Sequence, residues 1–195
     1  MENYRELANS VQEIYRDAGK AFGEFQAKSK LNCITGCGKC CLNPNITASQ
    51  LEMLPYALEL IENGTAQEVY EKLCSIDFSS GSSCILYEKT SSDGLFGKCG
   101  AYQNRPSICR SFGASARLNK RDEKEWVVCA LIKEKHKEHL VVADIEASPI
   151  MGQFASMVST LNPYLGDKQY PINEALLLIL NKVLMAYGYE AESIA

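Results

Sequence analysis

The chain has 195 residues, a length that suits one domain. Hydrophobic residues make up 46% of it and charged residues 23%, which is the balance of a soluble globular protein and excludes disorder over most of the chain. The formal net charge of -4 argues against a nucleic-acid-binding module that depends on phosphate contacts. We therefore predict a single domain over residues 1–195 without a nucleic-acid partner.

Nine cysteines are the unusual feature of the composition. Because nine is an odd number, disulfides cannot pair every thiol. The N-terminus is acidic and has no basic segment followed by an apolar one, so we expect no secretory signal. The longest apolar run, residues 175–180, is far shorter than the roughly 20 residues that cross a membrane. These features predict a cytoplasmic protein that does not enter a membrane, where thiols stay reduced and serve metal or redox chemistry.

The first part of the chain has a helical pattern that stops at the first cysteines. Apolar residues recur at steps of three and four over residues 4–27 and predict an amphipathic helix. Residues 31–45 contain glycines, an Asn-Pro pair and four cysteines, so they cannot continue the helix. We expect irregular backbone there.

Two capping patterns predict helices after this segment. Thr47-Ala48-Ser49-Gln50 is typical of a capping box and predicts a helix start. Pro55, inside that helix, either kinks it or starts another helix. The pattern Thr65-Ala66-Gln67-Glu68 predicts a second, short helix that carries Cys74.

The middle of the chain is predicted to form a small hairpin. Residues 84–87 have the composition of a short strand, residues 91–94 that of a turn, and residues 97–102 that of a returning strand. The pair Arg105-Pro106 predicts a turn or helical turn through Arg110. A short apolar segment follows at residues 126–132 and contains Cys129.

Two helices are predicted in the C-terminal part, residues 147–188. Ser148-Pro149 resembles a helix N-cap followed by proline, which predicts a helix to about Leu161. Pro171 opens a last helix that ends before Gly188 and is apolar nearly all round, which indicates a central core helix or an oligomer contact. We therefore expect a mainly α fold with a small β-hairpin, in which helices at both ends surround an irregular, cysteine-rich, metal-binding centre.

Eight of the nine cysteines form two groups along the chain. The first group lies within nine residues and consists of Cys33, Cys37, Cys40 and Cys41. The second group is spread over residues 84–129 and consists of Cys84, Cys99, Cys109 and Cys129. Several converging thiolates are what a soft metal ion or an iron–sulfur cluster requires. We therefore predict that these eight residues bind metal, at one shared site or two adjacent sites.

Other interpretations of the cysteines and histidines remain open at this level. Free cysteines are common as small core residues, and this is our expectation for Cys74, which lies apart from both groups. Disulfides are the alternative if the compartment is oxidising. The pair His136 and His139 lies one helical turn apart in a stretch rich in lysine and glutamate, which indicates a solvated helix face more than a metal site.

The spacing C-x3-C-x2-C of the first group is also found in radical S-adenosylmethionine enzymes, where it holds a cluster. In those enzymes the motif follows the first strand of a partial β/α barrel. Here a long helix precedes it, and the chain beyond residue 45 lacks alternating strands and helices. The context therefore does not favour this enzyme class.

The whole arrangement is more specific and resembles the CxxCxxCC family of zinc- or iron-chelating domains over residues 33–129. The last three cysteines of the family's first motif correspond to Cys37, Cys40 and Cys41. Cys33 corresponds to its first cysteine, and three residues instead of two separate it from Cys37. Its C-x-x-Y-x-x-R-P-x-x-C-R motif corresponds to residues 99–110. The flagellin lysine methylase is a larger relative, but this chain is short after Cys129, so methylase activity is not carried over.

Three residues of the second motif are expected beside the metal or cluster. Arg105 and Arg110 lie next to cysteines, where their charges offset thiolate charge, and Tyr102 shields the site from water. The sequence is equally compatible with Arg105 in a surface salt bridge and with Arg105 contacting the metal ligands without binding the metal itself. No convincing acid/base set is found, so the catalytic residues are unknown.

Three functions are compatible with these features. The favoured one is a metal-binding protein that holds a four-iron, four-sulfur cluster, with zinc as the alternative, because all ligands of the motif are cysteines. The second is an enzyme in which the cluster supports a redox or group-transfer reaction, as in a methyltransferase-like protein. The third is a thiol redox or metal-delivery module. The sequence identifies a metal ion or cluster as the partner and no protein partner.

Overall fold

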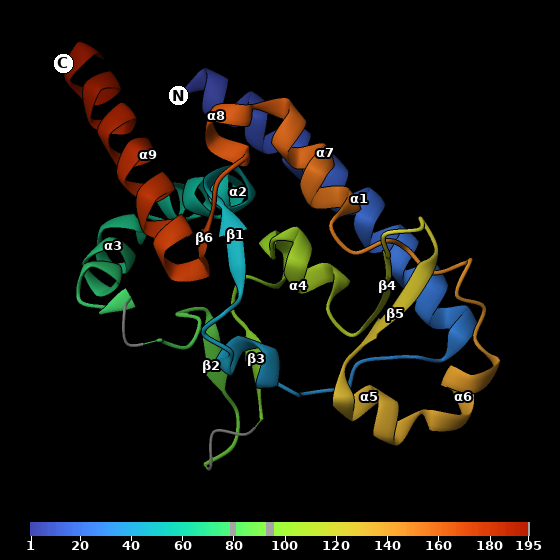
Figure 1. The fold of residues 1–195 in the computed structure, drawn as a ribbon. Coiled ribbons are helices and arrows are strands. Elements are labelled where there is room, and N and C mark those ends of the chain that lie inside the picture. The colour runs from blue at the N-terminus through green and yellow to red at the C-terminus, as the bar shows by residue number, and fades with distance from the viewer. Residues whose placement is uncertain (79–80, 93–95, 195) are drawn as a thin grey trace.

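The computed structural model describes the backbone of residues 1–78, 81–92 and 96–194, and the side chains of these ranges up to residue 188. The fold is mainly helical, with small two-stranded sheets and the cysteine-rich segments between the helices (Figure 1). This confirms the predicted fold class. Among the described residues, no helix combines the length and the apolar character needed to cross a membrane.

Helices from both ends of the chain pack around α2 (Gln50–Glu62). The long helix α1 (Glu2–Ser29) contacts α2 on one side and α9 (Ile172–Ile194) contacts it on another. Figure 1 shows α7 (Gln153–Leu161) beside α1, and α3 (Ala66–Cys74) beside α9. The short helix α8 (Pro163–Gly166) contacts α7. These helices form the frame on which the cysteine segments are placed.

The hydrophobic core lies where α1, α2 and α9 meet. The predicted amphipathic character of α1 is confirmed, because Val11 and Ala18 are fully buried while the opposite face is exposed. Leu176, Ile179 and Leu180 of α9 are also fully buried, as predicted for a core helix. However, α9 begins after Pro171, and it continues past Gly188 instead of ending there.

The starts of two other helices differ from prediction. Thr47 lies in a short strand, and Ser49 caps α2 in a reciprocal capping box with Glu52. The helix α2 then runs through Pro55 without a break. Helix α7 begins at Gln153 and not at Pro149, because residues 149–151 are extended and form backbone hydrogen bonds with Ala116.

The described residues form three antiparallel strand pairs, of which two are hairpins and one joins distant parts of the chain. Strand β1 (Thr47–Ser49) pairs with β6 (Gln169–Pro171), and β2 (Tyr87–Lys89) pairs with β3 (Gly97–Cys99). The predicted hairpin is therefore present, but β2 begins three residues later than predicted. The predicted turn at residues 91–94 falls partly outside the described residues.

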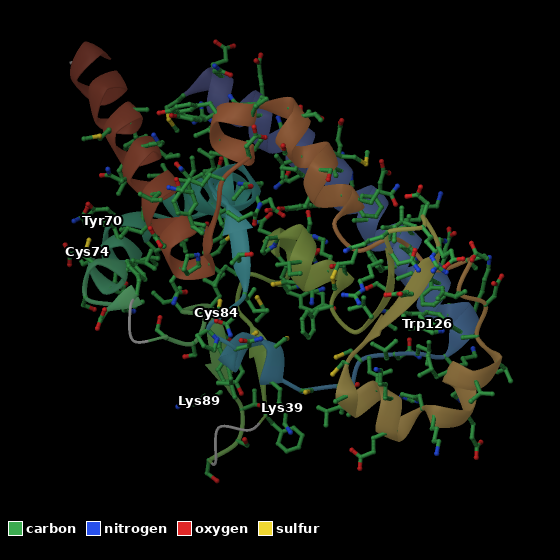
Figure 2. The ribbon with its side chains drawn as sticks, in the orientation of Figure 1. Lys39, Tyr70, Cys74, Cys84, Lys89 and Trp126 are labelled. Atoms are coloured by element: carbon green, nitrogen blue, oxygen red, sulfur yellow. The ribbon has the colours of Figure 1, made fainter. Side chains whose placement is uncertain are left out.

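A second hairpin was not predicted. Strand β4 (Ala114–Leu118) pairs with β5 (Lys124–Val128). Strand β5 carries Trp126, which is labelled in Figure 2, and its ring lies 6.1 Å from that of Phe25 in α1. Two short helices, α5 (Ala130–Lys135) and α6 (Lys137–Val142), follow. Together these elements form a second, smaller hydrophobic cluster beside α1, and Cys129 packs against it.

Candidate metal centre

The first cysteine loop is joined to the second cysteine group through backbone hydrogen bonds. A 3-10 helix, η1 (Lys39–Leu42), carries Cys40 and Cys41. The carbonyl oxygen of Cys41 accepts a 2.8 Å hydrogen bond from the Cys84 N–H. The carbonyl oxygen of Gly36 accepts one of 2.9 Å from Gly97 N–H in β3. Segments that lie far apart in the sequence are thereby placed side by side.

A buried asparagine of α9 fixes the segment that carries Cys84. The Asn173 side chain is 3% exposed. Its Oδ1 accepts a 2.9 Å hydrogen bond from the Ile85 N–H, and its Nδ2 donates to the Ser82 Oγ and the Ser83 carbonyl at 3.1 and 2.9 Å. The loop on both sides of Cys84 is therefore tied to the core helix.

A buried glutamate of α2 fixes the helix that carries Cys109. The Glu52 side chain is 2% exposed. One carboxylate oxygen accepts from the Ser49 N–H at 2.9 Å, and the other accepts from the Ser107 N–H at 3.0 Å. Ser107 is the first residue of α4 (Ser107–Ser111), so one carboxylate caps two helices. This contact places Cys109 against the core.

Five thiols, which we term the central thiol cluster, come together between η1, the Cys84 loop, β3 and α4. They are Cys40, Cys41, Cys84, Cys99 and Cys109. Each thiol lies close enough to at least two of the others for their charges to interact. Sulfur atoms are gathered near the labelled Cys84 in Figure 2. The cluster thus takes members from both groups of the sequence.

The protein environment disfavours thiolates over most of this cluster. Burial raises the pKa of Cys84 to about 11, and it raises the pKa of Cys99 and of Cys109 as well. Neighbouring thiolates raise these pKa values further, because like charges in a poorly solvated site repel. Cys40 is different, since a hydrogen bond with Cys41 lowers its pKa and raises that of Cys41.

The three remaining cysteines of the two groups lie apart from the central thiol cluster. Cys33 is exposed, and Cys37 and Cys129 are half-buried. The charges of Cys37, Cys40 and Cys129 all raise the pKa of Cys33, although burial is the largest cause. We term Cys33, Cys37 and Cys129 the outer thiols. Cys40 is the member of the central thiol cluster whose charge interacts with Cys33.

The residues expected beside the metal differ in where they lie. The positive charge of Arg105 favours the thiolates of Cys40, Cys99 and Cys109, and its guanidinium stacks on Tyr102 at 3.6 Å from the ring centroid. Tyr102 itself is 58% exposed.

Arg110 is turned toward the helical frame. Its guanidinium lies 4.3 Å from the ring centroid of Tyr15 in α1, and its Nε donates a 2.8 Å hydrogen bond to the carbonyl of Arg105. Burial lowers the pKa of Arg110. This guanidinium therefore connects the Arg105 turn to α1.

Cys74 is exposed at the end of α3, so the expectation that it is a core residue was wrong. The adjacent Leu73 takes the core position instead. The Cys74 thiol forms a hydrogen bond with Tyr70, on the outer side of the molecule in Figure 2. His136 lies between α5 and α6, and His139 is exposed on α6 with its ring 5.9 Å from that of His136.

Several residues that shape the centre were not identified from the sequence. Glu52 and Asn173 act through contacts with segments distant in the chain. The phenol of Tyr56 lies near the cluster, since the charges of Cys99 and Cys84 contribute to its raised pKa after the larger effects of burial and Glu59. Only the capping pattern around Ser49 gave a local signal for any of these residues.

A helical frame around a half-buried set of thiols defines a cysteine-cluster protein. The model of the CxxCxxCC family, described as a zinc- or iron-chelating domain, matches residues 32–136. This is more than half of the chain, so the chain belongs to this family. No similar curated protein and no similar solved structure was found. Metal chelation through several cysteines is thus the function that the family supports.

The donor atoms of the centre fit such a metal, although their present positions do not yet enclose one. Thiolates suit zinc and iron–sulfur clusters equally, and five of them share one half-buried region. Within the described part of the chain, no three side chains of His, Cys, Asp or Glu stand close enough to hold a single ion as they are. Binding therefore requires the sulfur atoms to turn toward a common point.

Proposed function

We propose that this protein is a cysteine-ligated metalloprotein of one domain, residues 1–195, that holds a four-iron, four-sulfur cluster in the cytoplasm. The observation that carries the proposal is the central thiol cluster, in which four separate segments contribute cysteines to one region. The proposed ligands are the eight cysteines of the two groups, namely Cys33, Cys37, Cys40, Cys41, Cys84, Cys99, Cys109 and Cys129.

The spacing of the thiols supports a cluster over a single zinc ion. Zinc is held by four ligands at about 2.0–2.3 Å, so its thiolates must nearly touch one another. A four-iron cluster is a wider body whose cysteine ligands stand further apart. In the described part of the chain the thiols interact through their charges, but no three of them converge on a single ion. This wider spacing of the thiols fits an iron–sulfur cluster better than a single zinc ion.

The neighbours of each thiol indicate which of two adjacent sites it belongs to. Cys41 and Cys109 each interact with Cys84 and Cys99, whereas Cys33 interacts with Cys37 and Cys129. Cys40 interacts with both sets. We therefore assign the primary cluster to the central thiols, and the outer thiols together with Cys40 to an adjacent site.

Arg105 supports the primary site electrostatically. Several thiolates in a half-buried region carry more negative charge than the surrounding chain offsets, and the guanidinium of Arg105 lies near three of them. A cation at this position lowers the cost of deprotonating the cysteines. Tyr102 holds the guanidinium by stacking, and Arg110 holds the turn by binding the Arg105 carbonyl. When bound, the cluster would supply electron transfer or a structural cross-link.

The test is anaerobic purification followed by analysis of iron, zinc, acid-labile sulfide and visible absorbance. We expect a brown protein with iron and sulfide in equal amounts. Cys109→Ser and Cys40→Ser should release metal and lower the free energy of unfolding, since each removes a ligand. Cys74→Ser is the matched control, because this exposed cysteine lies outside both sets and its loss should leave the metal content unchanged.

Three results would contradict the proposal. Full metal content in both the Cys109→Ser and the Cys40→Ser protein would show that the central thiols are not ligands. A colourless protein that contains zinc and no sulfide would replace the cluster with a zinc site. A chain that binds neither metal under reducing conditions would refute metal binding altogether.

A further inference from the structure

The ring of Tyr87 lies directly against the backbone of two glycines from different segments. A Cβ atom built on Gly38 would lie 2.0 Å from the Tyr87 Cε2, and one built on Gly97 would lie 2.2 Å from the same atom. Distances below 3.0 Å essentially never occur for real Cβ atoms. The half-buried ring therefore fills the space that side chains at these two positions would need.

The two glycines belong to segments that carry ligands of the proposed centre. Gly38 is the N-cap of η1, which continues into Cys40 and Cys41. Gly97 begins β3, which ends at Cys99, and Cys99 pairs directly with Tyr87 across the hairpin. One aromatic ring thus contacts the first cysteine loop and the strand of the second group at once.

Backbone conformation does not explain why residue 38 is glycine. Gly38 has φ of -94° and ψ of 9°, values that other residues adopt readily. Gly36 is the contrast in the same loop, since its φ of 74° favours glycine for backbone reasons. A Cβ at Gly36 would meet only the Phe96 ring, at 4.0 Å. The requirement at position 38 is therefore steric and comes from Tyr87.

We propose that Tyr87 is a positioning residue of the metal centre, whose ring sets the distance between the Cys40–Cys41 loop and the Cys99 strand through its contact with Gly38. This inference rests on the proposed function for its metal readout. The ring holds the two backbones at one separation, and the thiols of both segments face one region as a result.

The experiment is a Cd²⁺ titration of the reduced, metal-free full chain, followed through the thiolate-to-metal absorbance. Gly38→Ala pushes a methyl group into the Tyr87 ring. We expect this overpacking to weaken the affinity of the chain for Cd²⁺ by about tenfold or more. Tyr87→Ala removes the obstructing ring. The double variant Gly38→Ala with Tyr87→Ala should therefore bind Cd²⁺ more tightly than additivity of the two single variants predicts.

Two glycines of the same hairpin provide matched controls. Gly97→Ala should not be rescued by Tyr87→Ala, because its Cβ would also lie 2.5 Å from the backbone carbonyl of Glu88, which cannot move away. Gly100→Ala should be tolerated, because its nearest neighbour is the flexible end of the Glu88 side chain, at 2.7 Å.

The outcomes separate this inference from the proposed function. Wild-type affinity in Gly38→Ala, or strict additivity in the double variant, would overturn the positioning role while leaving metal binding intact. If the wild-type chain itself binds no Cd²⁺, the proposed function fails, and the positioning role is judged by urea unfolding of the same four metal-free proteins. Non-additive free energies of unfolding would then support the steric contact, and additive ones would overturn it.

Discussion

Asn173 is expected to hold the Cys84 segment on the core helix, and its removal gives a quantitative test of how the centre is built. In Asn173→Ala the Ile85 N–H and the Ser83 carbonyl lose their partner on α9. Ile85 is half-buried and Ser83 is exposed, so water replaces part of the lost hydrogen bonding, and each lost bond costs about 1 kcal/mol. We therefore expect the free energy of unfolding to fall by about 1–2 kcal/mol, which is a measurable share of the total.

Urea unfolding of the reduced, metal-free protein measures this loss. The midpoint should fall at an unchanged slope, because the surface exposed on unfolding stays the same. Alkylation of the native protein provides a local readout. The Cys84 side chain is 8% exposed, so iodoacetamide should modify it slowly in the wild type and faster once the segment is released. The site of modification is identified by mass spectrometry.

Asn9→Ala is the matched control, because Asn9 is exposed on α1 and the same substitution there should change stability by less than about 0.5 kcal/mol. The reasoning would be refuted if Asn173→Ala unfolded at the wild-type urea concentration and Cys84 kept its wild-type alkylation rate. In that case the three hydrogen bonds of Asn173 would not determine the position of the loop.

Two further predictions concern the frame around α4. Glu52→Gln leaves an amide facing at least one of the Ser49 and Ser107 N–H groups, so urea unfolding should show a loss of about 1–2 kcal/mol; an unchanged midpoint would contradict the double cap. Burial, then the Glu52 charge, raises the pKa of Tyr15. The buried, neutral phenol of Tyr15 therefore contributes its full share to the free energy of unfolding below about pH 10, the pKa of tyrosine in the unfolded chain. This contribution is lost as the pH rises above about 10. In Tyr15→Phe the urea midpoint should decrease less with pH above about pH 10 than in the wild type. The same decrease in both proteins would contradict a buried, neutral phenol.

The helical frame was largely predictable because its signals are local. The period of the apolar residues in α1 and the nearly continuous apolar composition of α9 depend only on residues close in the chain, and the structure buries the predicted face of α1 and much of α9. The errors at helix starts came from long-range contacts. The extended backbone of residues 149–151 is set by hydrogen bonds to Ala116, which no local capping pattern reveals.

The β4–β5 hairpin carried a local signal that was overlooked. Its turn is formed by Asn119, whose side-chain oxygen accepts hydrogen bonds from the Arg121 and Glu123 N–H groups. Asp122 adopts a positive φ of 60° there. Asparagine and aspartate with this spacing between two short apolar segments are typical turn chemistry. Recognising it would have placed Cys129 just after a strand.

The grouping of cysteines was less predictable, because proximity along the chain and proximity in space differ here. Cys37 and Cys40 are three residues apart, yet Cys40 belongs to the central thiol cluster and Cys37 to the outer thiols. The 3-10 helix η1 begins between them at Lys39 and changes the direction of the chain. Spacing identified the thiols but not the partners of each. The misplacement of Cys74 has a simpler cause, since Leu73 and Cys74 are consecutive and a helix can turn only one of them to the core.

The contacts that position the cysteine segments share one property: they are made to backbone atoms and not to sulfur. Glu52 binds the Ser107 N–H, Asn173 binds the Ile85 N–H, and Tyr87 packs on Gly38. Each segment is therefore held through its backbone, and the Cys84 and Cys99 thiols in addition receive backbone hydrogen bonds from Leu86 and Ala101. In small zinc domains that are unfolded without metal, the metal supplies most of the folding energy. Here the buried core is formed mainly by residues of α1, α2 and α9, with Cys84 among its members. A bound metal would add its binding free energy to the stability that this core supplies, and the chain would bring the cysteine-bearing segments together before the sulfur atoms turn toward the metal.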